Sequence, residues 1–188
     1  MNYAEIKYVD VANGPGCRVN LFVSGCSHHC KGCFNQETWD YNYGSEFSER
    51  EERIIMNRLN HDYIKGFTVL GGEPMDPRNI STIANLCKKI KDVYPDKDIW
   101  IYTGYTFEQL TKMYDYGTPQ HTYFDLLLHT IDVIVDGEFV EALSDLKLRF
   151  RGSSNQRFID VKETKIRLTD EVDGFKKYVI DELKFLNM

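Results

Sequence analysis

The sequence lacks several features that would assign it to whole classes of protein. No apolar run approaches the roughly 18 residues that a membrane-spanning helix needs, so we expect no membrane segment. Basic residues are in the minority, with 23 Lys and Arg against 29 Asp and Glu and a net charge of −6, so we expect no nucleic-acid partner. The opening MNYAEIKYVD is interrupted by charges and has no apolar core, which predicts a cytoplasmic protein without a signal peptide.

Cysteine is also scarce, with five in 188 residues. In the cytoplasm so few thiols do not indicate a disulfide framework, and clustered cysteines indicate metal or redox chemistry instead. Cys26, Cys30 and Cys33 form such a cluster, with the spacing C-x3-C-x2-C. Cys87 lies in an amphipathic helical pattern, where we expect a buried and inert thiol, and Cys17 lies outside the spacing of the cluster.

The sequence does contain the alternating pattern of an α/β domain. Short β-branched or aromatic runs that end in glycine predict buried strands at residues 18–25, 66–72, 98–104 and 132–139. Helical patterns lie between them at residues 48–61, 76–94, 106–117 and 123–131, the first of them with Ser48 and Glu51 as a capping box. This alternation predicts parallel strands with crossover helices.

After residue 145 the alternation ends. Residues 146–166 predict a hairpin or two strands with GSSNQ as the turn, and residues 169–188 predict a short helix. We find no linker and no repeat, so we expect one main domain over residues 1–162 and a C-terminal extension over residues 163–188 whose role is open.

The conspicuous motifs follow the ends of the predicted strands. The cysteine loop follows the first strand, GGEP the second, YTGY the third and DGEF the fourth. In parallel α/β architectures the carboxyl ends of the strands form the functional face. We therefore expect these four segments to meet at one site.

Three clustered cysteines are compatible with two kinds of metal centre. A structural zinc site needs a fourth ligand, and His28 or His29 would have to fold back within the loop to supply it. A 4Fe-4S cluster with three thiolate ligands instead keeps one iron open for a small molecule, as catalytic metal sites do. We favour the cluster, with Cys26, Cys30 and Cys33 as its ligands.

The cysteine loop followed by GGEP resembles the radical S-adenosylmethionine superfamily. The resemblance implies an α/β fold of the partial (incomplete) TIM-like β/α barrel kind. It also implies that S-adenosylmethionine binds the open iron through its methionyl amine and carboxylate, and that Gly71, Gly72 and Glu73 receive the amine. A positive ammonium needs a carboxylate acceptor, and glycine lets the backbone approach closely. A simple turn ended by Pro74 is the alternative interpretation.

Longer stretches are similar to the activating proteins of anaerobic (class III) ribonucleoside-triphosphate reductases. They are NGPGCRVNLFVSGCSHHCKGCFNQETWD, LGGEPMDP, IWIYTGY, DVIVDGEF and RFRGSSNQR, spanning about residues 3–162. The TGY and RGSSNQR segments favour this family over the activase of pyruvate formate-lyase. The resemblance implies that flavodoxin or a similar carrier donates an electron, and that S-adenosylmethionine is cleaved to methionine and a 5′-deoxyadenosyl radical. The radical then takes hydrogen from a glycine of the reductase.

The resemblance also implies roles for residues beside the motifs. Gly32 stands where many members of the superfamily have an aromatic residue, and Phe34 is the candidate for packing against adenine. Both are expected to line the cofactor. Thr103 and Asp136, at the ends of the third and fourth strands, are candidates for binding the ribose or the carboxylate, although a loop cap or turn residue fits each of them equally well.

Other residues near the motifs are expected to have accessory roles. Arg151 or Arg157, around the GSSNQ turn, is a candidate anchor for the cofactor or the partner. His28 and His29 are expected to be exposed loop residues that tune the cluster by hydrogen bonding. Trp39 is expected to be a core aromatic.

Two other hypotheses stay open. One is a radical enzyme with another target, either a different glycyl-radical enzyme such as pyruvate formate-lyase or a small molecule such as a deazapurine precursor. The other is a non-enzymatic zinc or iron–sulfur module that only binds or carries electrons. Replacing Glu73 separates the two, because a carrier would be indifferent to losing that carboxylate.

Overall fold

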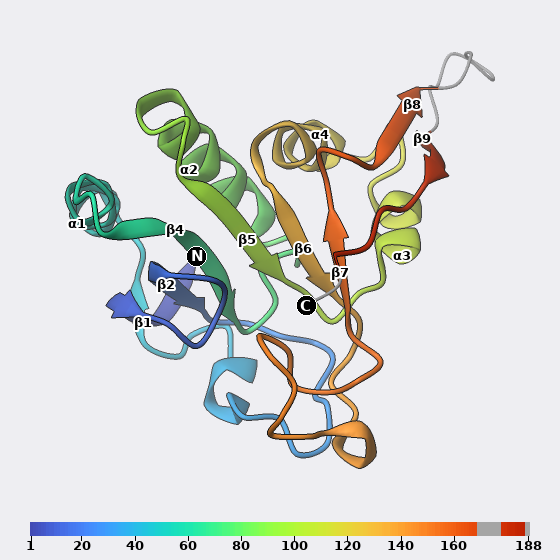
Figure 1. Cartoon of the computed structure of the whole chain (residues 1–188), viewed down its shortest axis with the longest axis horizontal. Helices are drawn as coiled ribbons and strands as arrows, with labels where there is room; N and C mark the ends of the chain where they lie inside the picture. Colours follow the sequence, from blue (N-terminus) through green and yellow to red (C-terminus); the bar gives the residue numbers. More distant parts are fainter. Residues whose placement is uncertain (169–177, 187–188) are drawn as a thin grey trace.

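The computed structural model describes residues 1–168 and 178–186 of the chain. The strands are β1 (Asn2–Asp10), β2 (Cys17–Val23), β3 (Ser45–Glu46), β4 (Ile64–Gly71), β5 (Asp98–Tyr102), β6 (Val133–Asp136), β7 (Arg157–Asp160), β8 (Lys165–Leu168) and β9 (Tyr178–Glu182). The helices are α1 (Glu49–Leu59), α2 (Ile80–Val93), α3 (Phe107–Met113) and α4 (His121–Thr130), with short 3-10 turns η1 (Gln36–Trp39) and η2 (Glu141–Leu143). Strands β1 to β7 form one sheet in the order β3-β1-β2-β4-β5-β6-β7, and β8 pairs with β9 (Figure 1).

The centre of the large sheet is the predicted parallel unit. Strands β2, β4, β5 and β6 are the four predicted strands, and they pair in parallel in that order. The predicted helices connect them: α1 precedes β4, α2 precedes β5, and α3 and α4 precede β6. Prediction and structure therefore agree on a mixed α/β fold with a parallel centre.

The described sheet is open, and a TIM-like barrel is not shown. Strands β1, β3 and β7 are antiparallel to their neighbours and lie toward the two edges, so the repeat of strand and crossover helix stops on both sides. The expected partial barrel is therefore supported only as a mixed sheet that is mostly parallel in its centre.

The helices pack on one face of the sheet and form the main core there. Val19 and Leu21 of β2 are fully buried in it, as are Ile83 and Ile90 of α2. Cys87 belongs to the same cluster, which confirms the expected buried thiol. Alternation along the strands and the helical repeat of α2 thus produce this core directly.

Two helices begin with the reciprocal caps that their sequences encode. The Ser48 side chain accepts a hydrogen bond at the start of α1, and Glu51 accepts one from the Ser48 backbone N–H at 3.0 Å, which confirms the predicted capping box. Thr106 and Gln109 form the same arrangement at α3. Each box satisfies backbone N–H groups that a helix start leaves without partners.

The opposite face of β2 contains a buried arginine. Arg18 is fully buried, forms an ion pair with Asp98 and donates from Nε to Thr68 Oγ1 at 2.7 Å. The Thr68 hydroxyl in turn donates to the Asn13 carbonyl at 2.9 Å. This network fixes the segment before β2, which reaches the cavity described below.

Several expectations for the two ends of the chain are wrong. Strand β1 was not predicted. Residues 146–156 form no strand, and β7 instead pairs with β6 while β8 pairs with β9. The helix predicted over residues 169–188 is a strand at Tyr178–Glu182, and the rest of that prediction up to residue 177, with residues 187–188, lies outside the described residues. The domain division at residue 162 stays a prediction.

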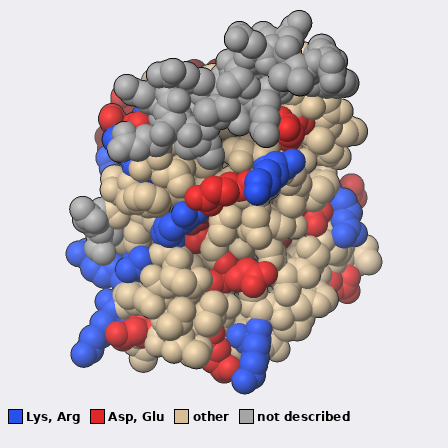
Figure 2. Space-filling view, turned by 90° about the vertical axis from the view of Figure 1, so that its right-hand side faces the viewer, with Lys and Arg blue, Asp and Glu red and all other residues tan. Residues whose placement is uncertain are grey.

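The charged side chains on the face that Figure 2 shows are mixed, with Asp and Glu lying between Lys and Arg. The described atoms of that face therefore offer no broad basic surface. Within the described residues, no helix combines the length and the apolar character that crossing a bilayer requires.

Candidate metal centre and cofactor cavity

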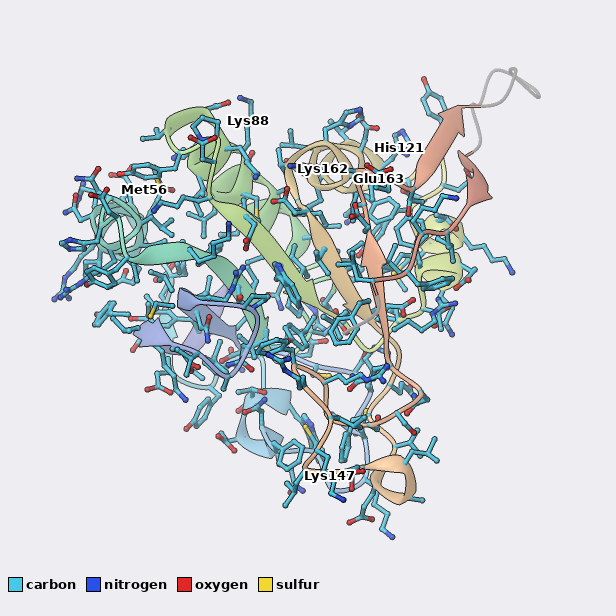
Figure 3. All side chains as sticks on the ribbon, in the orientation of Figure 1. Met56, Lys88, His121, Lys147, Lys162 and Glu163 are labelled. Atoms are coloured by element: carbon cyan, nitrogen blue, oxygen red, sulfur yellow. The ribbon has the colours of Figure 1, made fainter. Side chains whose placement is uncertain are left out.

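A cavity of about 450 Å³ opens where the four parallel strands end. It is lined by the cysteine loop, the GGE segment after β4, Thr103 and Gly104 after β5, and the loop after β6. In Figure 1 the cysteine loop is the light blue loop and the loop after β6 the orange loop, both below the strand ends. Lys147, labelled in Figure 3, marks the orange loop at the end of the molecule opposite Lys88. The four motif segments thus meet at one cavity, whose volume is typical of small-molecule sites.

All three clustered cysteines line this cavity, and Cys17 and Cys87 do not. Cys26 is buried, and burial raises the pKa of its thiol to about 11. Burial also raises the pKa of Cys30. A bound metal centre is the kind of charge that would hold these sulfurs as thiolates, so metal binding here would release protons.

The beginning of the cysteine loop is fixed by backbone contacts. Gly25 N donates to Thr38 O at 2.7 Å, and Cys26 N donates to Trp39 O at 3.2 Å. Gly25 has φ +94°, and a Cβ there would lie 2.1 Å from the Tyr41 ring. The glycine is therefore required both for the backbone conformation and for the close approach.

Glu73 lines the cavity and is only 1% exposed. Its Oε1 accepts from Met75 N and its Oε2 from Gly104 N, both at 2.8 Å. Because each carboxylate oxygen can accept more than one hydrogen bond, Oε1 retains capacity for another donor. Gly72 packs against this region, since a Cβ there would lie 2.6 Å from Gly25 O.

The two histidines of the loop differ, and the expectation for His28 is wrong. Its side chain is only 9% exposed, with Nε2 3.2 Å from Glu73 Oε2 and Nδ1 2.9 Å from Glu138 Oε1. Burial lowers the pKa of His28, but the two carboxylates raise it by more, so the net shift is upward. His29 is exposed, as expected, and stacks on Trp39 with the ring centres 4.7 Å apart.

The candidate cofactor residues fall into two groups. Phe34 and Thr103 line the cavity; Phe34 is 71% exposed and its ring centre is 5.2 Å from that of Phe139. Gly32 does not line it, and a Cβ on Gly32 would lie 2.8 Å from the Glu141 carboxylate. Glycine suits this position because its φ is +74° and because the Glu141 carboxylate leaves little room for a side chain.

Asp136 also does not line the cavity. It is fully buried, accepts from Phe107 N at 2.8 Å at the start of α3, and accepts from Arg157 Nε at 2.9 Å. The carboxylate thus caps a helix and pairs with an arginine, which corresponds to the cap interpretation of this residue. The direct cofactor contact stays an untested prediction, without support from this geometry.

The GSSNQR segment holds the loop after β6. Gln156 donates from Nε2 to Gly137 O at 3.0 Å and accepts from Gly152 N at 2.8 Å, while Asn155 donates to Glu138 O at 2.8 Å. Arg151 lines the cavity. These side-chain amides therefore supplement the single β-bridge of the loop, between Ser144 and Ser153.

Sequence reasoning missed several lining residues. Trp39 lines the cavity instead of the core, and its buried indole N–H has no partner among the described residues. Tyr102, Phe150 and Gln156 also line it. The position of Tyr102 directly before TGY was a usable signal, whereas nothing local indicated that Phe150 would fold back over the cavity.

The described residues contain no group of three or more His, Cys, Asp or Glu side chains arranged to hold a single metal ion. A zinc site would need such a group, with four ligands around one atom. The three clustered thiols line one cavity, and thiolates are the donors that iron–sulfur clusters take, so the residues present fit such a group.

Comparison with known proteins gives a consistent result. A model of the family described as 4Fe-4S single cluster domain matches residues 12–159. A protein of Escherichia coli K12 named anaerobic ribonucleoside-triphosphate reductase-activating protein is 44% identical over 158 residues, which cover 83% of this chain and 96% of the relative. Proteins with the same name in Vibrio cholerae serotype O1 and Enterobacteria phage T4 are 43% identical (83% and 96% covered) and 41% identical (84% and 92% covered).

Proposed function

The chain belongs to the family of anaerobic ribonucleoside-triphosphate reductase-activating proteins, and we propose that it activates such a reductase by radical S-adenosylmethionine chemistry. The observation that supports this most directly is that three thiols of one loop and the buried Glu73 line the same cavity. A bound 4Fe-4S cluster supplies the electron that cleaves S-adenosylmethionine to methionine and a 5′-deoxyadenosyl radical, which takes hydrogen from a glycine of the reductase.

The residues of this chain hold and orient the reactants. Cys26, Cys30 and Cys33 would hold the cluster through their thiolates, and three protein ligands would let its fourth position take a small molecule. Glu73 accepts the methionyl ammonium through the remaining capacity of Oε1, and the N–H groups of Met75 and Gly104 hold its carboxylate in place. An ion pair with a carboxylate as deeply buried as that of Glu73 is screened less than one in water.

The cavity wall also limits the access of water. Phe22, Leu70 and Phe150 give it apolar surface, and Phe34 and Phe139 contact each other near the cysteine loop. A reactive radical needs such surroundings, because water and stray hydrogen donors compete with the intended substrate. Gly71 and Gly72 let the backbone before Glu73 pack closely against Val23 and Gly25, which brings this segment into the cavity wall.

The partner and the location follow from the same proposal. The substrate is the glycyl-radical subunit of the reductase, and flavodoxin or a similar one-electron carrier is the donor. A reducing cytoplasm suits a chain whose five cysteines are all free thiols in the structure.

The test is reconstitution of the protein with iron and sulfide without oxygen, followed by reduction in the presence of S-adenosylmethionine. We expect 5′-deoxyadenosine by chromatography and, with the reductase added, a glycyl-radical signal by electron paramagnetic resonance. The Glu73→Gln variant keeps the side-chain shape but loses the charge, and it should bind iron normally while 5′-deoxyadenosine formation falls about 10-fold or more.

Controls separate the alternatives. A carrier module with a full complement of iron would form no 5′-deoxyadenosine, and this result would contradict the enzyme proposal. Pyruvate formate-lyase in place of the reductase tests the other glycyl-radical target, and a stronger radical signal there would move the assignment to that partner.

A further inference from the structure

The side chain of His28 leaves the cysteine loop and fills the space between the ends of the other three parallel strands. Its Nε2 lies 3.2 Å from Glu73 Oε2 after β4, and its Nδ1 lies 2.9 Å from Glu138 Oε1 after β6. The ring also covers Gly104 after β5, where a Cβ would lie 2.7 Å from it. One imidazole thus connects the cysteine loop to all three neighbouring strand ends.

We propose that His28 is a positioning residue that holds the Glu73 carboxylate in the orientation that receives the methionyl ammonium of S-adenosylmethionine. The inference rests on the proposed function, because it takes Glu73 as the acceptor of the amine. Gly104 N donates to Oε2, and the imidazole Nε2 lies 3.2 Å from the same oxygen without completing a hydrogen bond, whereas Oε1 accepts from Met75 N. The imidazole therefore lies against Oε2, which favours Oε1 as the oxygen that receives the amine.

The histidine is itself held in place from its other side. Glu138 binds Nδ1, and the carbonyl of the same residue accepts from Asn155 Nδ2 at 2.8 Å. A chain of contacts therefore runs from the GSSNQR segment through Glu138 and His28 to Glu73. The Tyr105 ring packs edge-on against the imidazole, with the ring centres 4.3 Å apart. Outer partners that orient a ligand typically contribute 10- to 100-fold to affinity or activity.

Three substitutions of His28 separate its two contacts. Glutamine places its amide nitrogen near the position of Nε2 and can keep the Glu73 contact, whereas asparagine places its own near Nδ1 and can keep only the Glu138 contact. We expect His28→Ala to weaken S-adenosylmethionine binding about 10-fold. His28→Gln should restore most of the affinity and His28→Asn little of it. A role confined to packing would not produce this order.

The measurement is the dissociation constant of S-adenosylmethionine, by calorimetry on anaerobically reconstituted protein whose iron content is determined in every sample. His29→Asn is the matched control, because it removes a histidine from the same loop, and asparagine tolerates its φ of 52°. His29 makes no contact with either carboxylate among those found for the described residues, so the affinity should stay within about twofold of wild type.

A second variant reaches the same contact without altering the cysteine loop. Gly104→Ala would bring a methyl group against the His28 ring and displace it, which should weaken binding in the wild-type background. In the His28→Ala background the ring is gone, so the same change should cost little. A double-mutant cycle therefore measures whether Gly104 acts through His28.

Each outcome decides between the proposals. Equal dissociation constants for wild type and all three His28 variants, at equal iron content, overturn the positioning role and leave the proposed function intact. Wild-type protein with full iron that binds no S-adenosylmethionine overturns both. If His28→Ala loses iron, Gly104→Ala decides, because an unchanged affinity in that variant overturns the positioning role.

Discussion

At the scale of single residues, five thiols of the same intrinsic chemistry occupy different surroundings. Cys26, Cys30 and Cys33 lie on a loop and line a cavity, whereas Cys87 is sealed in the helix-covered core. Burial raises the pKa of Cys87 strongly, so it stays a neutral, unreactive thiol. Position on a loop or in a core therefore decides which cysteines can become metal ligands.

The iron content of cysteine variants tests this difference between the clustered cysteines and Cys87. Alanine at Cys26, Cys30 or Cys33 should each abolish stable cluster binding after reconstitution, because a cluster with two protein thiolates is poorly held. Cys87→Ala should bind iron as wild type does and lower the free energy of unfolding by about 1 kcal/mol, through a small cavity in the core. Full iron in a variant of the three clustered cysteines would contradict the ligand assignment.

Sequence could assign the chemistry of some site residues but not the direction of every side chain. The cysteine spacing and the GGE segment predicted the cavity wall because both follow strand ends. His28 and Asp136 differ because their positions depend on contacts with residues far along the chain. His28 reaches Glu138, and Asp136 reaches Arg157, by folding of the loop after β6. No local pattern encodes such contacts.

At the scale of elements, Arg157 joins a strand to a helix. It lies at the start of β7 and binds Asp136 at the end of β6, and it also binds Glu108 of α3 through two hydrogen bonds of 3.0 and 2.7 Å. Arg157 was one of two candidate anchors for the cofactor or the partner. Its contacts are with other parts of the fold, although the loop that it helps to fix reaches the cavity. Strand β7 lies within the strand predicted after the GSSNQ turn, but its antiparallel partner is β6 and not residues 146–151, because the chain returns to the sheet only after the long loop that contains η2.

The Glu108→Gln variant tests the Arg157–Glu108 contact through the pH dependence of the free energy of unfolding. The Arg157 hydrogen bonds lower the pKa of Glu108 from its ordinary value of 4.5 to about 2, against a smaller opposing effect of burial. A carboxylate with a lowered folded-state pKa adds stability above pH 4.5 and loses it as the pH falls toward 2. Wild type should therefore lose more stability than the variant between pH 5 and pH 2.5, as denaturant melts would measure.

The expected size of this effect is small. Glu108 is about half exposed, so solvent screening limits the pair to about 1 kcal/mol at most. Glu49→Gln is the control, since that carboxylate is 89% exposed and lies 3.7 Å from its cation. Identical pH profiles for wild type and Glu108→Gln would show that the Arg157 contact contributes nothing to folding.

At the scale of the whole molecule, the core and the site lie on different parts of one sheet. Helices cover one face and bury the main apolar cluster (Figure 1), while the loops at the strand ends line the cavity. The parallel centre could be predicted because buried strands and amphipathic helices have strong local patterns. The open edges could not, because β1 is only partly buried and β3 is two residues long.

This separation predicts what metal removal does. Cys26, Cys30 and Cys33 lie on a loop outside the helix-covered core. Protein without metal should therefore keep its α/β circular dichroism. Loading with the metal centre at about 100 times its dissociation constant should add about 2.7 kcal/mol to the free energy of unfolding. This corresponds to a rise of about 5–10 °C in melting temperature for a chain of this length.

Hydrogen exchange should slow on metal loading at residues 24–40, 70–74 and 137–156 and remain unchanged in α2. The double variant Cys26→Ala, Cys33→Ala should show no rise in melting temperature. Complete unfolding of the metal-free protein would mean that the cluster, and not the helix-covered core, holds the sheet together.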